Sequence, residues 1–207
     1  MRFRFAVLAV FAALPLTIAA CGGGDDTTGA TQSQVSQTDQ DQITKAIQFA
    51  AISGDPKACT EAQTLKFTEQ TSGASGQAAV KQCEQDAKDT AANSVKVTNI
   101  QGDSDSATAD ASFTGKFFNG QTIEVGLVKE DGTWKLDEAI GFKSFDRDAF
   151  LTGLKQQFAS QGGASSQQIA CVSKNLDALS DQQIEDLFLN SDKQLENQVF
   201  NPCFQGG

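Results

Sequence analysis

The sequence predicts an α+β fold, in which helices pack on a four-stranded antiparallel meander and a small, disulfide-stapled, all-helical region follows. The first observation is a change of period. Apolar residues recur at helical spacing up to about residue 92, alternate with polar residues over 94–140, and return to helical spacing after Phe145. The second is that turn dipeptides separate the alternating stretches. The third is that four cysteines, an even number, remain when Cys21 is excluded.

Composition narrows the classes of function. The 207-residue chain is 39% apolar with only three prolines, which is typical of one or two globular domains. It has neither His nor Tyr, so the commonest general base and transition-metal ligand are absent. We therefore expect no catalytic residue and no cofactor. With 16 basic against 26 acidic residues it has no basic patch for a phosphate backbone, so nucleic acid is not an expected partner.

The first 20 residues are typical of a secretory signal peptide. Arg2 and Arg4 are followed by an apolar run over 5–16 and by small residues over 17–20. The run is shorter than the roughly 20 residues that a membrane-spanning helix needs. We expect residues 1–20 to be removed, which leaves 14 basic against 26 acidic residues, a net charge of −12. This balance favours solubility.

The residues Ile18-Ala19-Ala20-Cys21 resemble the lipobox of bacterial lipoproteins. The resemblance implies cleavage before Cys21 and a diacylglyceryl group on its sulfur, which would anchor the protein to the outside of the cell membrane. The alternative is a soluble secreted protein in which Cys21 is incidental. The Gly-, Asp-, Thr-, Ser- and Gln-rich residues that complete the segment 21–38 cannot form a core and predict a flexible tether.

Assigning Cys21 to lipid leaves Cys59, Cys83, Cys171 and Cys203, an even set for an oxidising compartment. Three pairings are possible. The local one, Cys59 with Cys83 and Cys171 with Cys203, keeps each bond inside one predicted subdomain. Zinc is the competing use of four cysteines, but their spacing lacks the close pairs of zinc sites, so we expect no metal.

Three helices are expected before the sheet. The first covers 38–53 and ends at Gly54. Asp55 is a predicted N-cap with Pro56 in the first turn, so a short second helix carries Cys59. The third, near 77–92, places Val80, Cys83 and Ala87 on one stripe and directs Cys83 toward the second helix.

Four strands follow, because apolar residues alternate with polar ones between turn signals. The inward residues of each strand in turn are Val95 and Val97; Ala107, Ala109, Ala111 and Phe113; Ile123, Val125 and Leu127; and Trp134, Leu136 and Ile140. Asn119-Gly120 and Asp131-Gly132 supply the positive φ angles of tight hairpins. One face of this meander is apolar, and the preceding helices must cover it.

The element order over 39–145 is similar to that of the NTF2-like, cystatin-fold superfamily, including small domains of unassigned function in bacterial lipoproteins. Two sequence segments support the likeness. One is residues 49–55, where a predicted helix ends at Gly-Asp, and the other is Asp131-Gly132-Thr133-Trp134-Lys135-Leu136. The resemblance implies a curved sheet that forms a cone. A cone pocket would be lined by Phe113, Phe117 and Trp134.

Glu138 is the one acidic residue of the meander in the phase of Trp134 and Leu136, so it is a candidate lining residue and proton carrier of the cone. The alternative is a bulge or strand end that turns it to solvent. Asp103, Asp105 and Asp110 are oxygen ligands near one turn, but they lack the spacing and closing Glu of an EF-hand. We expect a solvated hairpin there.

Residues 146–207 predict a helical C-terminal subdomain. Phe150, Leu151, Leu154 and Phe158 form one helical face, and Ser165 with Gln168 and Ser180 with Gln183 predict two capping boxes that open further helices. Leu195 and Val199 fall in a last short segment stapled by Cys203. About 60 residues of short helices make a marginal core alone, so the subdomain either depends on its disulfide or packs on the first domain.

These features predict a membrane-anchored extracytoplasmic lipoprotein that acts as a non-catalytic binding or interaction module of the cell envelope. Its expected partners are the membrane, through Cys21, and an envelope protein or a small apolar ligand. The alternatives are an isomerase- or dehydratase-type enzyme and a small apolar ligand carrier, both using the cone. A buried acid facing a cavity would favour the enzyme, and a large dry cavity would favour the carrier.

Overall fold

The computed structural model describes residues 35–116, 118–161 and 164–204, with the side chains of 159–161 excepted. The predicted signal peptide, Cys21, most of the tether, and Phe117 lie outside the described residues. No helix in the described part is long and apolar enough to cross a membrane. The described residues all belong to one unit, Gln32–Gly207.

Four helices precede the sheet: α1 (Gln37–Ile52), α2 (Ala58–Glu61), α3 (Leu65–Ser72) and α4 (Gln77–Thr90). The sequence predicted α1, α2 and α4 but not α3. Thr64 caps α3, because its side chain accepts a hydrogen bond from the Phe67 amide, and Gly73 ends it in the left-handed conformation. The fully buried position of α3 is held by Thr68, so the apolar periodicity that reveals a helix is missing.

The sheet is the predicted antiparallel meander. Its strands β1 (Ser94–Gly102), β2 (Ser106–Thr114), β3 (Thr122–Glu130) and β4 (Thr133–Ser144) lie in the order β1-β2-β3-β4. Asp131 and Gly132 both have positive φ, 49° and 78°, as a tight hairpin between β3 and β4 requires. At the β1–β2 turn, the Asp103 carboxylate accepts hydrogen bonds from the Asp105 and Ser106 amides. Among the described residues no cluster of His, Cys, Asp and Glu could hold a metal ion.

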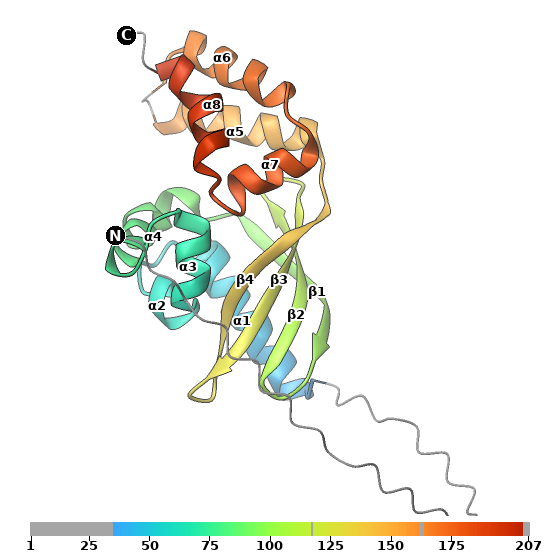
Figure 1. Cartoon of the computed structure of the whole chain (residues 1–207). Helices are drawn as coiled ribbons and strands as arrows, with labels where there is room; N and C mark the ends of the chain where they lie inside the picture. The colour runs from blue at the N-terminus through green and yellow to red at the C-terminus, as the bar shows by residue number, and fades with distance from the viewer. Residues whose placement is uncertain (1–34, 117, 162–163, 205–207) are drawn as a thin grey trace, which may run out of the picture. The chain divides into compact units, whose positions relative to one another are not determined.

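The first core lies between α1 and one face of the sheet (Figure 1). Ile43 and Ile47 of α1 are buried against inward residues of the strands, among them Ala109, Val125 and Leu127. Figure 1 shows α2, α3 and α4 beside α1 and close to β4. The helices cover the apolar face of the sheet, as the alternating pattern demands.

A bulge in β4 corrects the predicted strand phase. Gly126 of β3 pairs with Glu138, whereas the next residue, Leu127, pairs with Leu136, so β4 has one extra residue at this point. Residues 138–140 therefore lie on the faces opposite to those that strict alternation predicts. Ala139 is buried, while Glu138 and Ile140 point to solvent, and Ile140 is 44% exposed. The predicted inward position of Ile140 is wrong for this reason.

Four helices follow the sheet: α5 (Arg147–Gln161), α6 (Ser166–Asp177), α7 (Asp181–Phe188) and α8 (Lys193–Phe204). Both predicted capping boxes, at Ser165 and Ser180, are present. The last helix is longer than the short segment expected and contains Pro202 near its end. Buried residues of these helices form a second core: Phe150, Leu151, Leu154, Val172, Leu176, Leu179, Ile184, Leu187, Leu195, Val199 and Cys203.

The two disulfides have the predicted pairing, Cys59–Cys83 and Cys171–Cys203. The first joins α2 to α4 beside the first core, and the second joins α6 to α8 in the second core. Contacts between apolar side chains link the cores instead. Phe118 packs against both, and Leu189, which follows α7, is buried among the residues of the first core.

Candidate functional site

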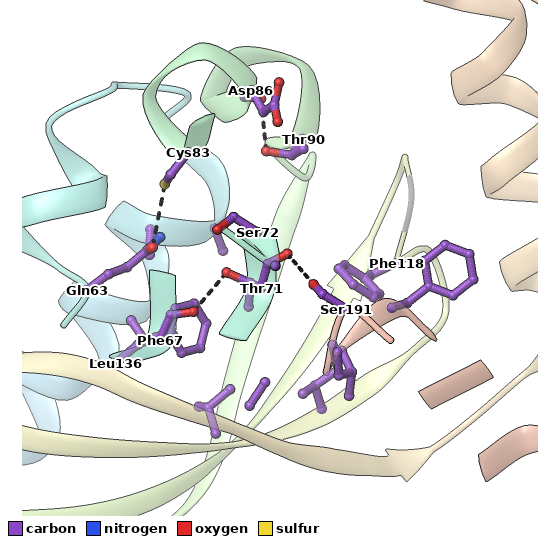
Figure 2. A pocket seen from close by; sticks show the side chains of 18 of the residues that line it. Gln63, Phe67, Thr71, Ser72, Cys83, Asp86, Thr90, Phe118, Leu136 and Ser191 are labelled. Atoms are coloured by element: carbon purple, nitrogen blue, oxygen red, sulfur yellow. Dashed lines mark hydrogen bonds between the residues drawn. The ribbon is translucent and has the colours of Figure 1, made fainter. Parts of the chain in front are cut away.

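A pocket of about 660 Å³ lies between α1, α3 and α4, the inner face of the sheet, and the segment that joins α7 to α8. Figure 2 shows it from close by. Apolar side chains form most of its walls: Ile47, Ala50, Ala51, Phe67, Ala74, Ala92, Ala111, Phe113, Phe118, Ile123, Val125, Leu136, Ala139, Leu187, Phe188, Leu189 and Phe200. Its volume falls in the range of roughly 300–1,000 Å³ that is typical of small-molecule sites.

Small side chains explain why this space is open. Ala50 and Ala51 of α1 line one wall, and Ala111 of β2 and Ala139 of β4 line the sheet side. A methyl group reaches only a short distance from its backbone, so these alanines leave room that larger side chains would fill. The bulge contributes to this, because it turns Ala139 inward in place of Glu138 and Ile140.

The end of α7 and the segment that joins it to α8 close one side of the pocket. Leu187, Phe188 and Leu189 line it, and Leu189 is only 2% exposed. The Gln70 side chain of α3 donates to Asn190 Oδ1 at 2.9 Å and to the Ala139 carbonyl at 2.8 Å. These contacts hold the segment against α3 and β4.

Two further hydrogen bonds fasten the same segment. Ser191 Oγ donates to the Thr71 carbonyl at 3.1 Å, a contact that Figure 2 draws. The Phe142 amide donates to Glu185 Oε2 at 2.6 Å, which ties α7 to β4. The hydrogen bond between Thr71 and Ser191 thus joins two lining residues that are 120 positions apart in the chain.

Polar and charged groups gather at the mouth. Asp86 of α4 and Lys193 of α8 are exposed, and Glu196 is half-buried. Lys193 Nζ lies 2.8 Å from Glu196 Oε2, so its charge is already paired. The uncharged polar residues of the lining are Gln63, Thr71, Ser72, Gln82, Thr90 and Ser191.

Gln63 is held in the wall by its backbone. The Thr64 amide donates to the Leu136 carbonyl at 2.8 Å, and the Leu136 amide donates to the Ala62 carbonyl at 2.9 Å. These bonds form a short parallel bridge between Gln63 and Leu136 of β4. The side chain of Gln63 is thereby placed beside Cys83 and near Phe67 (Figure 2).

The structure places the four predicted lining residues differently. Phe113 lines the pocket. Trp134 is 1% exposed but not part of the lining, because its indole Nε1 donates to Asp39 Oδ1 at 2.8 Å in the first core. Phe117 lies outside the described residues.

Glu138, which the sequence made a candidate lining residue, lies on the outer side of β4. Lys66 Nζ lies 2.8 Å from Glu138 Oε2 and 3.0 Å from Asp137 Oδ2. These hydrogen bonds, the one to Glu138 first, raise the pKa of Lys66. Glu138 therefore belongs to a surface ion pair and does not face the pocket.

One comparison with known proteins gives a match. Residues 41–140 match a family model described as the C-terminal domain of low molecular weight antigen MTB12. The matched residues run from α1 into β4 and stop before α5, so they cover just under half of the chain. No curated protein and no solved structure matches the chain. The match supports a bacterial protein of unassigned function, and with the two disulfides it indicates an extracytoplasmic location.

Proposed function

We propose that this protein is an extracytoplasmic binding protein that takes a small apolar ligand into the pocket. The observation that carries the proposal is the pocket itself, about 660 Å³ with mostly apolar walls. Transfer of an apolar molecule from water into such a site is favourable in proportion to the area removed from water, at about 25 cal/mol per Å². Of the functions considered from the sequence, the ligand carrier fits this geometry best.

Binding without catalysis is part of the proposal. The chain has no His or Tyr, and the acidic residues of the lining, Asp86 and Glu196, lie at the mouth. Glu138, the candidate acid of the cone, is in an ion pair with Lys66 on the outer surface. A general acid or base must reach its substrate within hydrogen-bonding distance, and neither carboxylate of the described lining is buried among the apolar side chains.

The proposal includes two finer features. One is an NTF2-like cone, supported by the helices that cover one face of the four-stranded meander and by the pocket enclosed there. The other is anchoring to the cell membrane through lipid on Cys21, supported by the resemblance of residues 18–21 to a lipobox. A lipid-anchored carrier would hold its pocket close to the membrane, which is a source of apolar molecules.

The test is the binding of a neutral apolar dye, N-phenyl-1-naphthylamine, whose fluorescence rises in apolar surroundings. Ala51 lines the pocket and Ala78 is exposed on α4 outside it. Ala51→Trp fills the pocket and should weaken dye binding by about tenfold or more, whereas Ala78→Trp should leave it unchanged. Equal binding by Ala51→Trp, with both disulfides intact, would contradict the proposal.

A further inference from the structure

We infer that the pocket selects an uncharged amphiphile, a molecule with one apolar chain and a neutral hydroxyl or ester end that hydrogen-bonds to the Gln63 amide. This inference rests on the proposed function and names the chemical class of its ligand. It follows from how charge and hydrogen-bonding capacity are distributed around the lining.

The charges at the mouth disfavour an anionic end group. Lys193 is the one basic residue of the described lining, and it is paired with Glu196 at 2.8 Å. Asp86, an exposed residue of the lining, adds a negative charge, and the whole chain carries a net charge of −10. A carboxylate or phosphate entering here would compete with Glu196 for Lys193 and would approach carboxylates of its own sign.

Gln63 offers an uncharged alternative. Its Nε2 has no hydrogen-bond acceptor among the described residues, and its Oε1 has only weak donors. The Thr68 hydroxyl has one hydrogen, and the Thr64 carbonyl at 2.9 Å is closer to it than Gln63 Oε1 at 3.3 Å. Cys83 Sγ lies 3.6 Å from Oε1 but has no hydrogen to donate, because it is in a disulfide.

The position of Gln63 makes this free capacity useful to a ligand. The side chain is half-buried in the wall, and the bridge between Gln63 and Leu136 fixes its backbone. An amide can both donate and accept, so it suits a hydroxyl, which does the same, and an ester carbonyl, which accepts. A half-buried polar group that lacks a partner gains most from a ligand that supplies one.

The test compares two probes with the same chain and different ends, 1-dodecanol and dodecanoate, in displacing N-phenyl-1-naphthylamine from the full chain. The measurement is made at mildly alkaline pH, where dodecanoate is ionised. We expect dodecanol to displace the dye at a concentration about tenfold lower than dodecanoate. Gln63→Leu should weaken dodecanol binding by about fivefold, through loss of one hydrogen bond.

Two further variants complete the test. Gln101→Leu is the control: it changes an exposed glutamine of β1 outside the pocket and should bind dodecanol as the wild type does. Lys193→Met removes the one basic side chain of the described lining and shows whether dodecanoate binds through it. Tighter binding of dodecanoate than of dodecanol, lost in Lys193→Met, would overturn the inference and leave the proposed function intact. If the wild type does not bind the dye, neither probe has anything to displace, and the proposed function is overturned as well.

Discussion

Asp39 shows how one residue joins the start of α1 to the sheet. Its carboxylate accepts hydrogen bonds from Lys129 Nζ at 2.6 Å, Trp134 Nε1 at 2.8 Å and Ser36 Oγ at 2.7 Å. These bonds, the one from Lys129 first, lower the pKa of Asp39 from 3.8 to about 2. They also explain why Trp134 packs in the core and leaves the pocket lining to smaller residues.

The first prediction concerns this carboxylate. A lowered pKa stabilises the fold fully above the pKa of the unfolded chain, 3.8, and the contribution is lost as the pH falls through about 2. We therefore expect Asp39→Asn to have a lower Tm than the wild type at neutral pH, with a difference that shrinks as the pH falls from 3.8 toward 2. Asp41→Asn, on the exposed part of the same helix, is the control. A constant difference across this range would show that the ionised form of Asp39 is not what stabilises the fold.

At the scale of elements, the capping box of α7 positions one wall of the pocket. Ser180 Oγ accepts from the Gln183 amide, and Gln183 Oε1 accepts from the Ser180 amide. The helix that begins here carries Leu187 and Phe188 to the pocket.

The second prediction is that Ser180→Ala lowers the free energy of unfolding by about 1 kcal/mol, because it leaves the first amides of α7 without their side-chain acceptor. Urea unfolding monitored by circular dichroism measures this. Ser104→Ala, in the exposed β1–β2 turn, should stay within about 0.5 kcal/mol of the wild type. An equal loss in both variants would mean that the cap does not stabilise α7.

Element by element, the sequence was informative wherever the signal was local. Asp131-Gly132 fixed a hairpin, and Ser165 and Ser180 fixed two helix starts, because each signal depends on residues within one turn. A bulge or strand end at Glu138 was considered, but the bulge could not be located and Ile140 was placed inward, because an extra residue in β4 is defined only by its pairing with β3. The helix α3 was missed because Thr68 occupies its fully buried position.

The candidate site was harder to predict than the fold for the same reason. Phe113 could be assigned to the inner face from the alternation of β2. The other side of the pocket comes from Leu187, Phe188 and Leu189, which the sequence placed in a separate helical region. Their position in the pocket wall depends on contacts between distant segments, such as the hydrogen bond between Gln70 and Asn190. No local sequence pattern reveals such contacts.

At the scale of the whole molecule, Leu189 links the C-terminal helices to the first core. It follows α7 in the chain but is buried among the residues that α1 and the sheet contribute. No disulfide of the described residues crosses between the two cores, so this link depends on packing, on Phe118, and on the hydrogen bonds of Gln70 and Ser191.

The third prediction is that Leu189→Ala lowers the free energy of unfolding by about 2–5 kcal/mol, the usual range for a buried leucine. It should also enlarge the pocket on the side that this residue closes. Trp134, the chain's one tryptophan, lies in the first core and reports unfolding there by fluorescence. Leu65→Ala, at a leucine that is 50% exposed, should change stability by less than about 0.5 kcal/mol. A loss that small in Leu189→Ala would show that the C-terminal helices do not depend on this contact.

The fourth prediction concerns where the protein resides in the cell, and it tests the proposed anchor. If Cys21 carries lipid, Cys21→Ser should abolish labelling with a palmitate analogue and move the protein from the membrane fraction to the soluble extracytoplasmic fraction, because each buried CH₂ of an acyl chain adds about 0.8 kcal/mol to membrane binding. The four other cysteines are in disulfides, so they offer no thiol for acylation. The folded part should be unchanged, with both disulfides present and the dye bound as in the wild type. Labelling that persists in Cys21→Ser would mean that the lipid is attached elsewhere or that the sequence at residues 18–21 is not a lipobox.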